Sequence, residues 1–290
     1  MKTIVTHSGS FHTDDVFACA VLLSLYPEAT FIRTREKDIV DKADIVFDVG
    51  GQYDPKTNRY DHHQKEGAGQ RDTGIPYAAF GLIWKHFGME LCGDERVWQR
   101  LDSSLVSQID ATDNGMDFGG NKNLILVEDA SMVFSKSWLE DKDEEDFFVP
   151  VKKAQEYLLR KIKVMKDDIS AEDILTKIYN DSEDKRVLEI PEDLPRYIYQ
   201  GVFSRLEDVL FVVYKSSSSD AYKAEAIRKD ETTMESRKKF PQEWWGILDD
   251  KDERIKDLDL KGLLFCHRGG FLISADTKEN VESLVKRALE

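Results

Sequence analysis

The sequence predicts an α/β fold in which a mostly parallel sheet is flanked by helices, followed by a smaller α/β or α+β domain. Two observations support this class. Residues 2–6 and 44–48 are short, β-branched and apolar, which is typical of buried parallel strands, and helix-like periodicity alternates with such runs. A chain of 290 residues with 41% apolar content can bury a core in each of two domains.

The elements of the first half follow this alternation. Residues 14–25 carry apolar side chains near helical spacing and predict a helix after the first strand. Residues 76–87 and 94–109 predict two further helices by the same criterion. Between these helices, turn residues separate strand-like stretches at 31–33, 44–49 and 53–60.

The second half begins with a long helix, predicted from apolar residues at helical spacing over 151–165. Ser170 and Asp173 resemble a capping box, which predicts the start of another helix. Residues 180–186 are polar and aperiodic and predict a domain boundary, so that the domains cover 1–180 and 187–290. The second domain is expected to hold strands at 197–200, 209–214, 262–266 and 270–273 and a closing helix at 279–289.

Charge limits how the chain could hold a polyanion. The formal net charge is −15, which argues against binding of nucleic acid by bulk electrostatics. Residues 1–150 carry 15 basic and 27 acidic side chains, a balance of −12, whereas residues 151–290 carry 26 and 29, a balance of −3. If a polyanion binds, the second half is the better place to look.

The expected location is the cytoplasm. The chain contains no run of eighteen apolar residues, and its first residues enter a strand directly, without a secretion signal. The cysteines Cys19, Cys92 and Cys266 are odd in number and widely spaced, so we expect them to be reduced, buried and inert.

Histidine and aspartate gather in three short motifs. Four of the six histidines lie in His7-x4-His12-x-Asp14 and in Asp61-His62-His63, and Asp48 ends the apolar run between these motifs. Imidazole nitrogen mixed with carboxylate oxygen suits manganese, iron, zinc or magnesium. Because functional crevices of open α/β sheets lie at the carboxyl ends of the strands, these side chains should converge at one sheet edge.

Two divalent ions about 3.5 to 4 Å apart can stabilise the attacking and leaving oxygens of phosphoryl transfer. Such a centre needs one bridging carboxylate, and Asp48 is the natural choice because it is fixed at a strand end. His7 and His12 would face one ion, and Asp14 and His62 the other. The second ion needs a further acid, for which Asp110 is the first choice and Asp113 the second.

Six segments resemble, in order, the motifs of the melanocyte-proliferating-gene family within the DHH phosphoesterase superfamily. They are His7–Asp15, Phe47–Gly50, Tyr60–Gln64, Ile109–Gly115, Arg237–Gly246 and Phe265–Ile273. The resemblance implies a DHH-type catalytic domain over 1–180 and a substrate-binding domain over 187–290 across a cleft. It also implies a 3′ to 5′ exonuclease activity.

Residue by residue, the resemblance implies a set of metal ligands and a set of catalytic helpers. The implied ligands are His7, His12, Asp14, Asp48, His62 and Asp110. His63 would contact substrate or help to protonate the leaving group, Asp61 would orient the histidines, and Asp15 would play a supporting part. The superfamily more often has aspartate where His12 stands, which leaves the native metal open.

Substrate contacts are expected in the second domain. Arg237, Lys238, His267 and Arg268 combine basic groups with a glycine-rich turn that tolerates close approach of a ligand. The alternative for the basic cluster is a role in surface solubility. For Trp244 and the tryptophan that follows it, core packing is favoured over base stacking.

These inferences lead to a metal-dependent phosphoesterase that hydrolyses phosphodiester bonds, with a 3′ to 5′ exonuclease on single-stranded RNA favoured. The expected cofactors are two divalent ions, with Mn²⁺ favoured over Mg²⁺; a homodimer is left open. One alternative is a small-molecule phosphohydrolase acting on short oligonucleotides, cyclic dinucleotides or pyrophosphate. A third is a non-catalytic metal-binding protein, which would take up metal without turnover.

Overall fold

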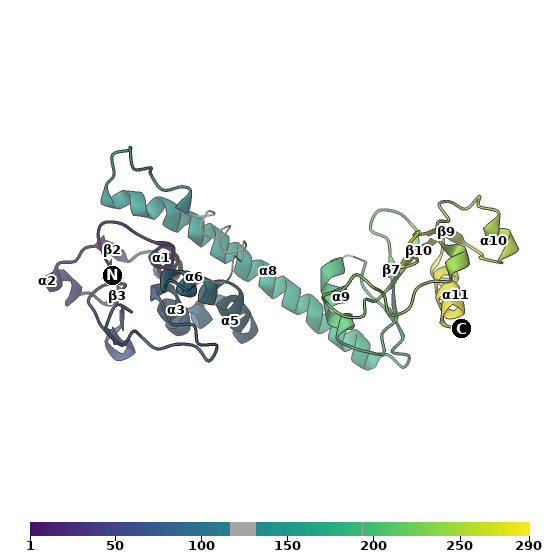
Figure 1. Ribbon diagram of the computed structural model, residues 1–290, viewed down its shortest axis with the longest axis horizontal. Helices are drawn as coiled ribbons and strands as arrows, with labels where there is room; N and C mark the ends of the chain where they lie inside the picture. Colours follow the sequence, from purple (N-terminus) through teal and green to yellow (C-terminus); the bar gives the residue numbers. More distant parts are fainter. Residues whose placement is uncertain (117–131, 193) are drawn as a thin grey trace. The chain divides into compact units, whose positions relative to one another are not determined.

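The computed structural model describes residues 1–116, 132–192 and 194–290 and divides into two compact units (Figure 1). Unit 1 covers Met1–Lys166 and unit 2 covers Asp167–Glu290. The division falls inside the long helix α8, Phe148–Asp181, and lies earlier in the chain than the boundary segment expected at 180–186. The assignment of a catalytic and a substrate-binding role to the two domains therefore stays a proposal.

Unit 1 is built on a five-stranded sheet in the order β2-β1-β3-β5-β4. The strands are β1 (Thr3–Thr6), β2 (Thr30–Arg33), β3 (Ile45–Phe47), β4 (Tyr53–Asp54) and β5 (Arg59–Tyr60). Every pairing except that of β4 with β5 is parallel, which confirms the predicted mostly parallel sheet. The single strand expected at 53–60 is wrong, because a 3-10 turn at Pro55–Thr57 and the left-handed Asn58 fold it into a hairpin.

Helices flank this sheet. On one face, Val5 and Val46 pack with Val40 of α2 (Lys37–Val40). The helix α1 (Thr13–Leu25) contacts α3 (Ala79–Ile83) and α6 (Ser107–Asp113). The remaining helical segments follow in chain order: a π-helical turn (Trp84–Gly88), α4 (Met89–Cys92), α5 (Glu95–Leu101), a second π-helical turn (Asp102–Val106) and a 3-10 turn (Glu144–Phe147).

Helix α1 is central because it is buried over most of its length, from Asp14 to Leu22. Its apolar residues fill the core of unit 1, whereas its first turn carries Asp14 and Asp15, both almost fully buried. Acidic side chains are favoured at a helix N-terminus by the helix dipole. This helix therefore delivers two buried carboxylates to the edge of the sheet where β1 ends.

Unit 2 contains a second five-stranded sheet in the order β6-β7-β8-β10-β9. Its strands are β6 (Val187–Glu189), β7 (Phe211–Lys215), β8 (Tyr222–Ala226), β9 (Leu263–Cys266) and β10 (Leu272–Ala275). Among the described strands of this unit, only β6 and β7 pair in parallel, so the unit is of the α+β type. Its helices are α9 (Arg196–Ser204), the short α10 (Arg254–Asp257) and the closing α11 (Lys278–Leu289).

Several elements of unit 2 differ from the prediction, and two of its strands, β6 and β8, were not predicted at all. Residues 197–200 form part of helix α9 rather than a strand, because Ile198, Val202 and Phe203 bury one helical face after Pro195 starts the helix. The helix start expected at Ser170 is also wrong, since this residue lies within α8. Strand β8 was missed because polar residues alternate with alanine along it.

Other features agree with expectation. The three cysteines are free and buried, and Trp244 is fully buried in the core of unit 2. None of the helices in the described parts of the chain is long and apolar enough to cross a membrane.

Candidate metal centre

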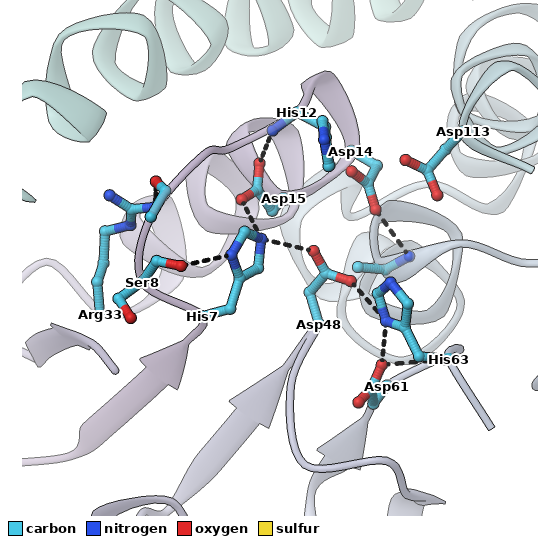
Figure 2. A network of polar contacts seen from close by, with 12 residues as sticks. His7, Ser8, His12, Asp14, Asp15, Arg33, Asp48, Asp61, His63 and Asp113 are labelled. Atoms are coloured by element: carbon cyan, nitrogen blue, oxygen red, sulfur yellow. Dashed lines mark hydrogen bonds and ion pairs between the residues drawn. The ribbon is translucent and has the colours of Figure 1, made fainter. Parts of the chain in front are cut away.

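The histidine and aspartate motifs meet at the carboxyl edge of the first sheet. His7 follows the last residue of β1, and Asp48 follows the last residue of the neighbouring parallel strand β3. Asp14 and Asp15 come from the first turn of α1. Figure 2 shows these side chains converging on Asp48, as the strand-end argument predicted.

Asp48 has an unusual backbone. Its φ of 55° lies in the left-handed region, which residues other than glycine rarely adopt and which costs about 1 kcal/mol or more. Its N–H donates to the carbonyl oxygen of Tyr60 at 3.2 Å, which ties the strand end to the next strand. This conformation turns the carboxylate into the cluster, where only 3% of the residue is exposed.

Asp48 lies between two groups of histidines. Its Oδ2 is 3.2 Å from Nε2 of His7, and its Oδ1 is 3.3 Å from Nε2 of His62 and 3.5 Å from Nδ1 of His63. Each carboxylate oxygen thus faces a different histidine motif. This is the arrangement that a bridging carboxylate requires.

Two further sets of ligand atoms flank Asp48. On one side, Oδ2 of Asp15 lies 3.0 Å from Nε2 of His7. On the other, His12, Asp14 and Asp113 bring ligand atoms within 4.8 Å of one another, and Oδ2 of Asp113 lies 3.4 Å from Nε2 of His62. The residues therefore form a continuous cluster rather than one compact triad.

Several buried atoms in this cluster lack a hydrogen bond of suitable geometry. Among the described residues, these include Oδ1 of Asp14, Oδ2 of Asp15, Oδ1 of Asp48 and Nε2 of His62. Oδ2 of Asp15 and Oδ1 of Asp48 meet only imidazole nitrogens, at 3.0 and 3.3 Å, and Nε2 of His62 meets only carboxylates, whereas Oδ1 of Asp14 has no such contact within the described residues. A buried polar atom without a partner costs about 1 to 3 kcal/mol, which a bound ligand would offset. Carboxylate oxygen and imidazole nitrogen are donors for divalent metals, and the residues present fit such ions.

The electrostatics point the same way. Burial disfavours a charge on His7, but the nearby carboxylates of Asp15 and Asp48 raise its pKa to about 10. Burial likewise opposes a charge on His62, yet Asp48 raises its pKa. The carboxylates therefore favour the protonated form of both imidazoles, and a divalent ion would compete with protons for the same nitrogen atoms.

The carboxylates of Asp14 and Asp48 differ in how neighbouring charges shift their pKa values. Burial, Asp48 and Asp113 together raise the pKa of Asp14 well above its ordinary value. Burial acts in the same direction on Asp48, but His62 and His7 outweigh it and lower the pKa. Asp48 is therefore the carboxylate that stays ionised, as a bridging ligand must.

Asp61 and His63 form a separate pair beside the cluster. Oδ2 of the buried Asp61 accepts the N–H of Gly51 at 2.5 Å, and Oδ1 accepts the N–H of His63 at 3.1 Å. The same oxygen lies 2.8 Å from Nδ1 of His63, whose side chain is 61% exposed. Asp61 thus orients the imidazole of His63, and exposure leaves that ring accessible to a substrate.

The structure brings Asp113, rather than Asp110, to the histidines. Oδ2 of Asp110 pairs with Nη1 of Arg71 at 2.7 Å, and Oδ1 accepts the N–H of Gly81 at 2.8 Å. The guanidinium of Arg71 also pairs with Asp102. The two acids lie three residues apart on one helix, so spacing alone could not distinguish them. Asp15, for which the resemblance implied only a supporting part, lies within the cluster beside His7.

A cavity of about 510 Å³ opens beside the cluster. His12, Asp14 and Asp113 line it together with Phe11 and Thr112. Polar ligand atoms and an aromatic ring therefore border the same space. A phosphodiester could approach the cluster from this side.

The predicted substrate-binding residues of unit 2 have varied surroundings. Arg237 donates from Nη1 to the carbonyl oxygens of Phe203 and Val209 at 3.1 and 2.9 Å, and it also contacts two further carbonyls. Nζ of Lys238 donates to a carbonyl oxygen of α11 at 2.8 Å. These bonds favour a structural role for both residues, and binding of substrate by them stays a prediction.

Comparison with known proteins identifies relatives along nearly the whole chain. The model of the uncharacterised protein family UPF0160 (MYG1_exonuc) matches residues 3–289. The MYG1 exonuclease of Homo sapiens is 27% identical over 99% of this chain and 85% of that protein. The MYG1 protein of Chlamydia trachomatis is 28% identical over 100% of this chain and 97% of that protein.

Among solved structures, RecJ of Thermus thermophilus in complex with Mn²⁺ matches with 14% identity and a TM-score of 0.28, over 99% of this chain and 51% of that one. The chain thus spans about half the length of that protein. The match of the family model over residues 3–289 agrees with the predicted metal-dependent hydrolase and confirms the predicted family: the chain belongs to the MYG1_exonuc family.

Proposed function

We propose that the chain is a metal-dependent phosphodiesterase that removes nucleotides from the 3′ end of single-stranded RNA. One observation carries the chemistry: Asp48 presents its two carboxylate oxygens to His7 and His62 in a cluster of buried, unsatisfied ligand atoms. Support for a nucleic-acid substrate comes from family membership and from relatives named exonuclease.

The residues divide into ligands and an orienting pair. His7, His12, Asp14, Asp15, Asp48, His62 and Asp113 would hold the metal, with Asp48 shared between two ions. A bound divalent ion would act as a Lewis acid on the phosphate and lower the pKa of a water molecule. His63, aligned by Asp61, would hold a proton on its exposed ring and deliver it to the leaving oxygen.

The experiment compares labelled RNA, DNA, dinucleotides and pyrophosphate with the purified protein, either stripped of metal or supplied with Mn²⁺ or Mg²⁺. We expect hydrolysis of RNA only when metal is supplied. On a strand labelled at its 5′ end, 3′ to 5′ digestion gives a ladder of shortening labelled products, whereas the opposite polarity releases a labelled mononucleotide at once.

The same assay separates the other function classes. Hydrolysis of dinucleotides or pyrophosphate without any action on longer strands would favour the small-molecule phosphohydrolase. Uptake of metal without hydrolysis of any of these substrates would favour a metal-binding protein, and it would overturn the proposed activity.

A further inference from the structure

A short loop joins the two histidines of the first motif. Strand β1 ends at Thr6 and α1 begins at Thr13, so residues 8–11 separate His7 from His12, which caps α1. We call residues 8–11 the histidine loop. The ring centroids of the two histidines lie 6.3 Å apart, and the course of the loop sets this separation. Because both rings are proposed metal ligands, whatever holds the loop also shapes the metal centre.

The histidine loop is held neither by its own backbone nor by close packing around Gly9. Among the described residues, the N–H groups of residues 8–11 donate no hydrogen bond. Gly9 has a φ of +91°, and a Cβ at this position would meet no atom within 4 Å. A cavity of about 710 Å³ is lined by Gly9, Ser10 and Phe11, and the cavity of about 510 Å³ follows at His12. The loop therefore runs past open space.

One side chain ties this loop to the sheet. Arg33 is the last residue of β2, which pairs in parallel with β1, and it lies opposite Thr6 in the register. Its Nη2 donates to the carbonyl oxygen of Gly9 at 2.7 Å. Figure 2 shows Arg33 beside the loop. Among the described residues, this is the only hydrogen bond that joins the histidine loop to a segment beyond His7 and His12.

Arg33 is itself anchored at the start of α8. Its Nη1 pairs with Oε2 of Glu144 at 2.6 Å. The guanidinium carbon lies 4.5 Å from the ring centroid of Phe147 and 5.3 Å from that of Phe11. The two rings meet edge to face, with their centroids 5.4 Å apart. Glu144 and Phe147 belong to the 3-10 turn that leads into α8, so Arg33 clamps the loop between the sheet and this turn.

The ion pair with Glu144 does not by itself account for the burial of Arg33. The Arg33 side chain is only 3% exposed, and burial of a guanidinium is costly unless it is well paired. The Glu144 side chain is 55% exposed, and such an ion pair stabilises a fold little. The other contacts of the guanidinium include the carbonyl of Gly9 and the ring of Phe11, which both belong to the histidine loop.

We propose that Arg33 is a positioning residue of the metal centre. By holding Gly9 and Phe11, it sets the separation of the two histidines before an ion binds. A ligand that is held in place loses less conformational entropy on binding. None of the described hydrogen bonds joins Arg33 to a proposed ligand, so it acts through the loop. Its effect on hydrolysis rests on the proposed function, whereas its effect on metal binding does not require catalysis.

The first test measures metal affinity without hydrolysis. Metal-stripped full-length protein is titrated with Mn²⁺ in a calorimeter. We expect Arg33→Gln to weaken Mn²⁺ binding by about ten- to a hundredfold, the range for residues that orient metal ligands. Arg33→Lys keeps the charge but not the fork of donors, so it should recover part of the affinity. Circular dichroism shows whether each variant is folded.

Arg59 supplies the matched control. It lies on β5 of the same sheet, and its guanidinium donates to the backbone carbonyls of Thr57 and Asp41 at 2.9 and 3.1 Å. Arg59→Gln removes an arginine with similar bonds away from the histidine loop, so it should lower the melting temperature without changing Mn²⁺ affinity. If Arg33→Gln also lowers only the melting temperature, Arg33 serves the fold alone and the proposal is overturned.

Glu144→Ala tests the clamp without a buried substitution. The side chain of Glu144 is half-exposed, so this variant should stay folded. Arg33 loses its anchor, and we expect Mn²⁺ binding to weaken about two- to fivefold, which corresponds to the strength of an exposed ion pair. If Arg33→Gln does not fold, this variant decides the matter, and an unchanged Mn²⁺ affinity overturns the proposal.

Kinetics separate positioning from contact with substrate. At saturating Mn²⁺, Arg33→Gln should recover most of the wild-type kcat with KM for oligonucleotides unchanged, because the bound ion then holds the histidines. Nε of Arg33 is buried without a hydrogen-bond partner among the described residues. A raised KM with unchanged Mn²⁺ affinity would assign this donor to substrate and overturn the proposal. A wild-type protein whose Mn²⁺ affinity depends on Arg33 but which hydrolyses nothing overturns the proposed function and leaves the positioning role standing.

Discussion

Buried carboxylates occur in both units, but they differ in how completely they are satisfied. In unit 1, Asp14, Asp15 and Asp48 each keep a buried oxygen that forms no well-oriented hydrogen bond among the described residues, and those of Asp15 and Asp48 meet only imidazole nitrogens, at 3.0 and 3.3 Å. In unit 2, both oxygens of Glu225 accept hydrogen bonds. The first arrangement needs a ligand to complete it, and the second is complete and fixes a neighbouring side chain.

Asp110 sharpens this comparison within unit 1. It is fully buried like the carboxylates of the metal cluster, yet its oxygens pair with Arg71 and with the N–H of Gly81. Burial alone therefore does not mark a ligand. Buried ligand atoms that lack well-oriented hydrogen bonds are the better mark, because a bound group can offset the cost of their desolvation.

The largest expected effect comes from Asp48→Asn. Asparagine tolerates the left-handed backbone, so the fold should persist, but a neutral amide cannot serve two ions. We expect hydrolysis to fall by more than about a thousandfold, since a metal-activated nucleophile contributes several kcal/mol to the barrier. Rates with Mn²⁺ and circular dichroism measure this, and retention of about a tenth of the rate would refute the bridging role.

Substitution of the adjacent His62 and His63 should affect different properties, metal binding for the first and turnover for the second. His63→Ala should lower kcat about a hundredfold, the usual range for a general acid, while bound metal stays unchanged because the ring is exposed. His62→Ala should lose metal, since Nε2 of His62 is buried within the cluster. Metal analysis of both purified variants decides the matter, and the opposite pattern would exchange the two roles.

Substitution of either candidate acid of α6 should have a smaller effect, and the two substitutions should act on different properties: metal affinity for Asp113 and stability for Asp110. Asp113→Asn should weaken metal binding by about ten- to a hundredfold with little change in the melting temperature of the metal-free protein. Asp110→Asn should leave metal affinity nearly unchanged but lower stability by about 2 kcal/mol, because it breaks a charged hydrogen bond to Arg71. Calorimetric titration with Mn²⁺ and thermal melting compare the variants, and loss of metal binding by Asp110→Asn alone would restore the original choice of ligand.

The sequence predicted the metal centre well where the order of the strands alone brings two site residues together. His7 and Asp48 follow parallel strands, so their meeting could be predicted from strand positions alone. The choice between Asp110 and Asp113 could not, because it depends on Arg71, a residue of a distant loop. Helix α9 was also missed, since its short apolar pattern fits a strand until the packing partners are known.

The smallest effect on activity is expected at Arg237, although the sequence suggested that this residue binds substrate. Its guanidinium donates to backbone carbonyls around the end of α9, including those of Phe203 and Val209. Arg237→Ala should therefore lower the melting temperature of the protein but leave KM for oligonucleotides and its salt dependence unchanged below that temperature. A raised KM in a fully folded Arg237→Ala variant would place this residue on the substrate path, and it would weaken the distinction between side chains that complete the fold and side chains that await a ligand.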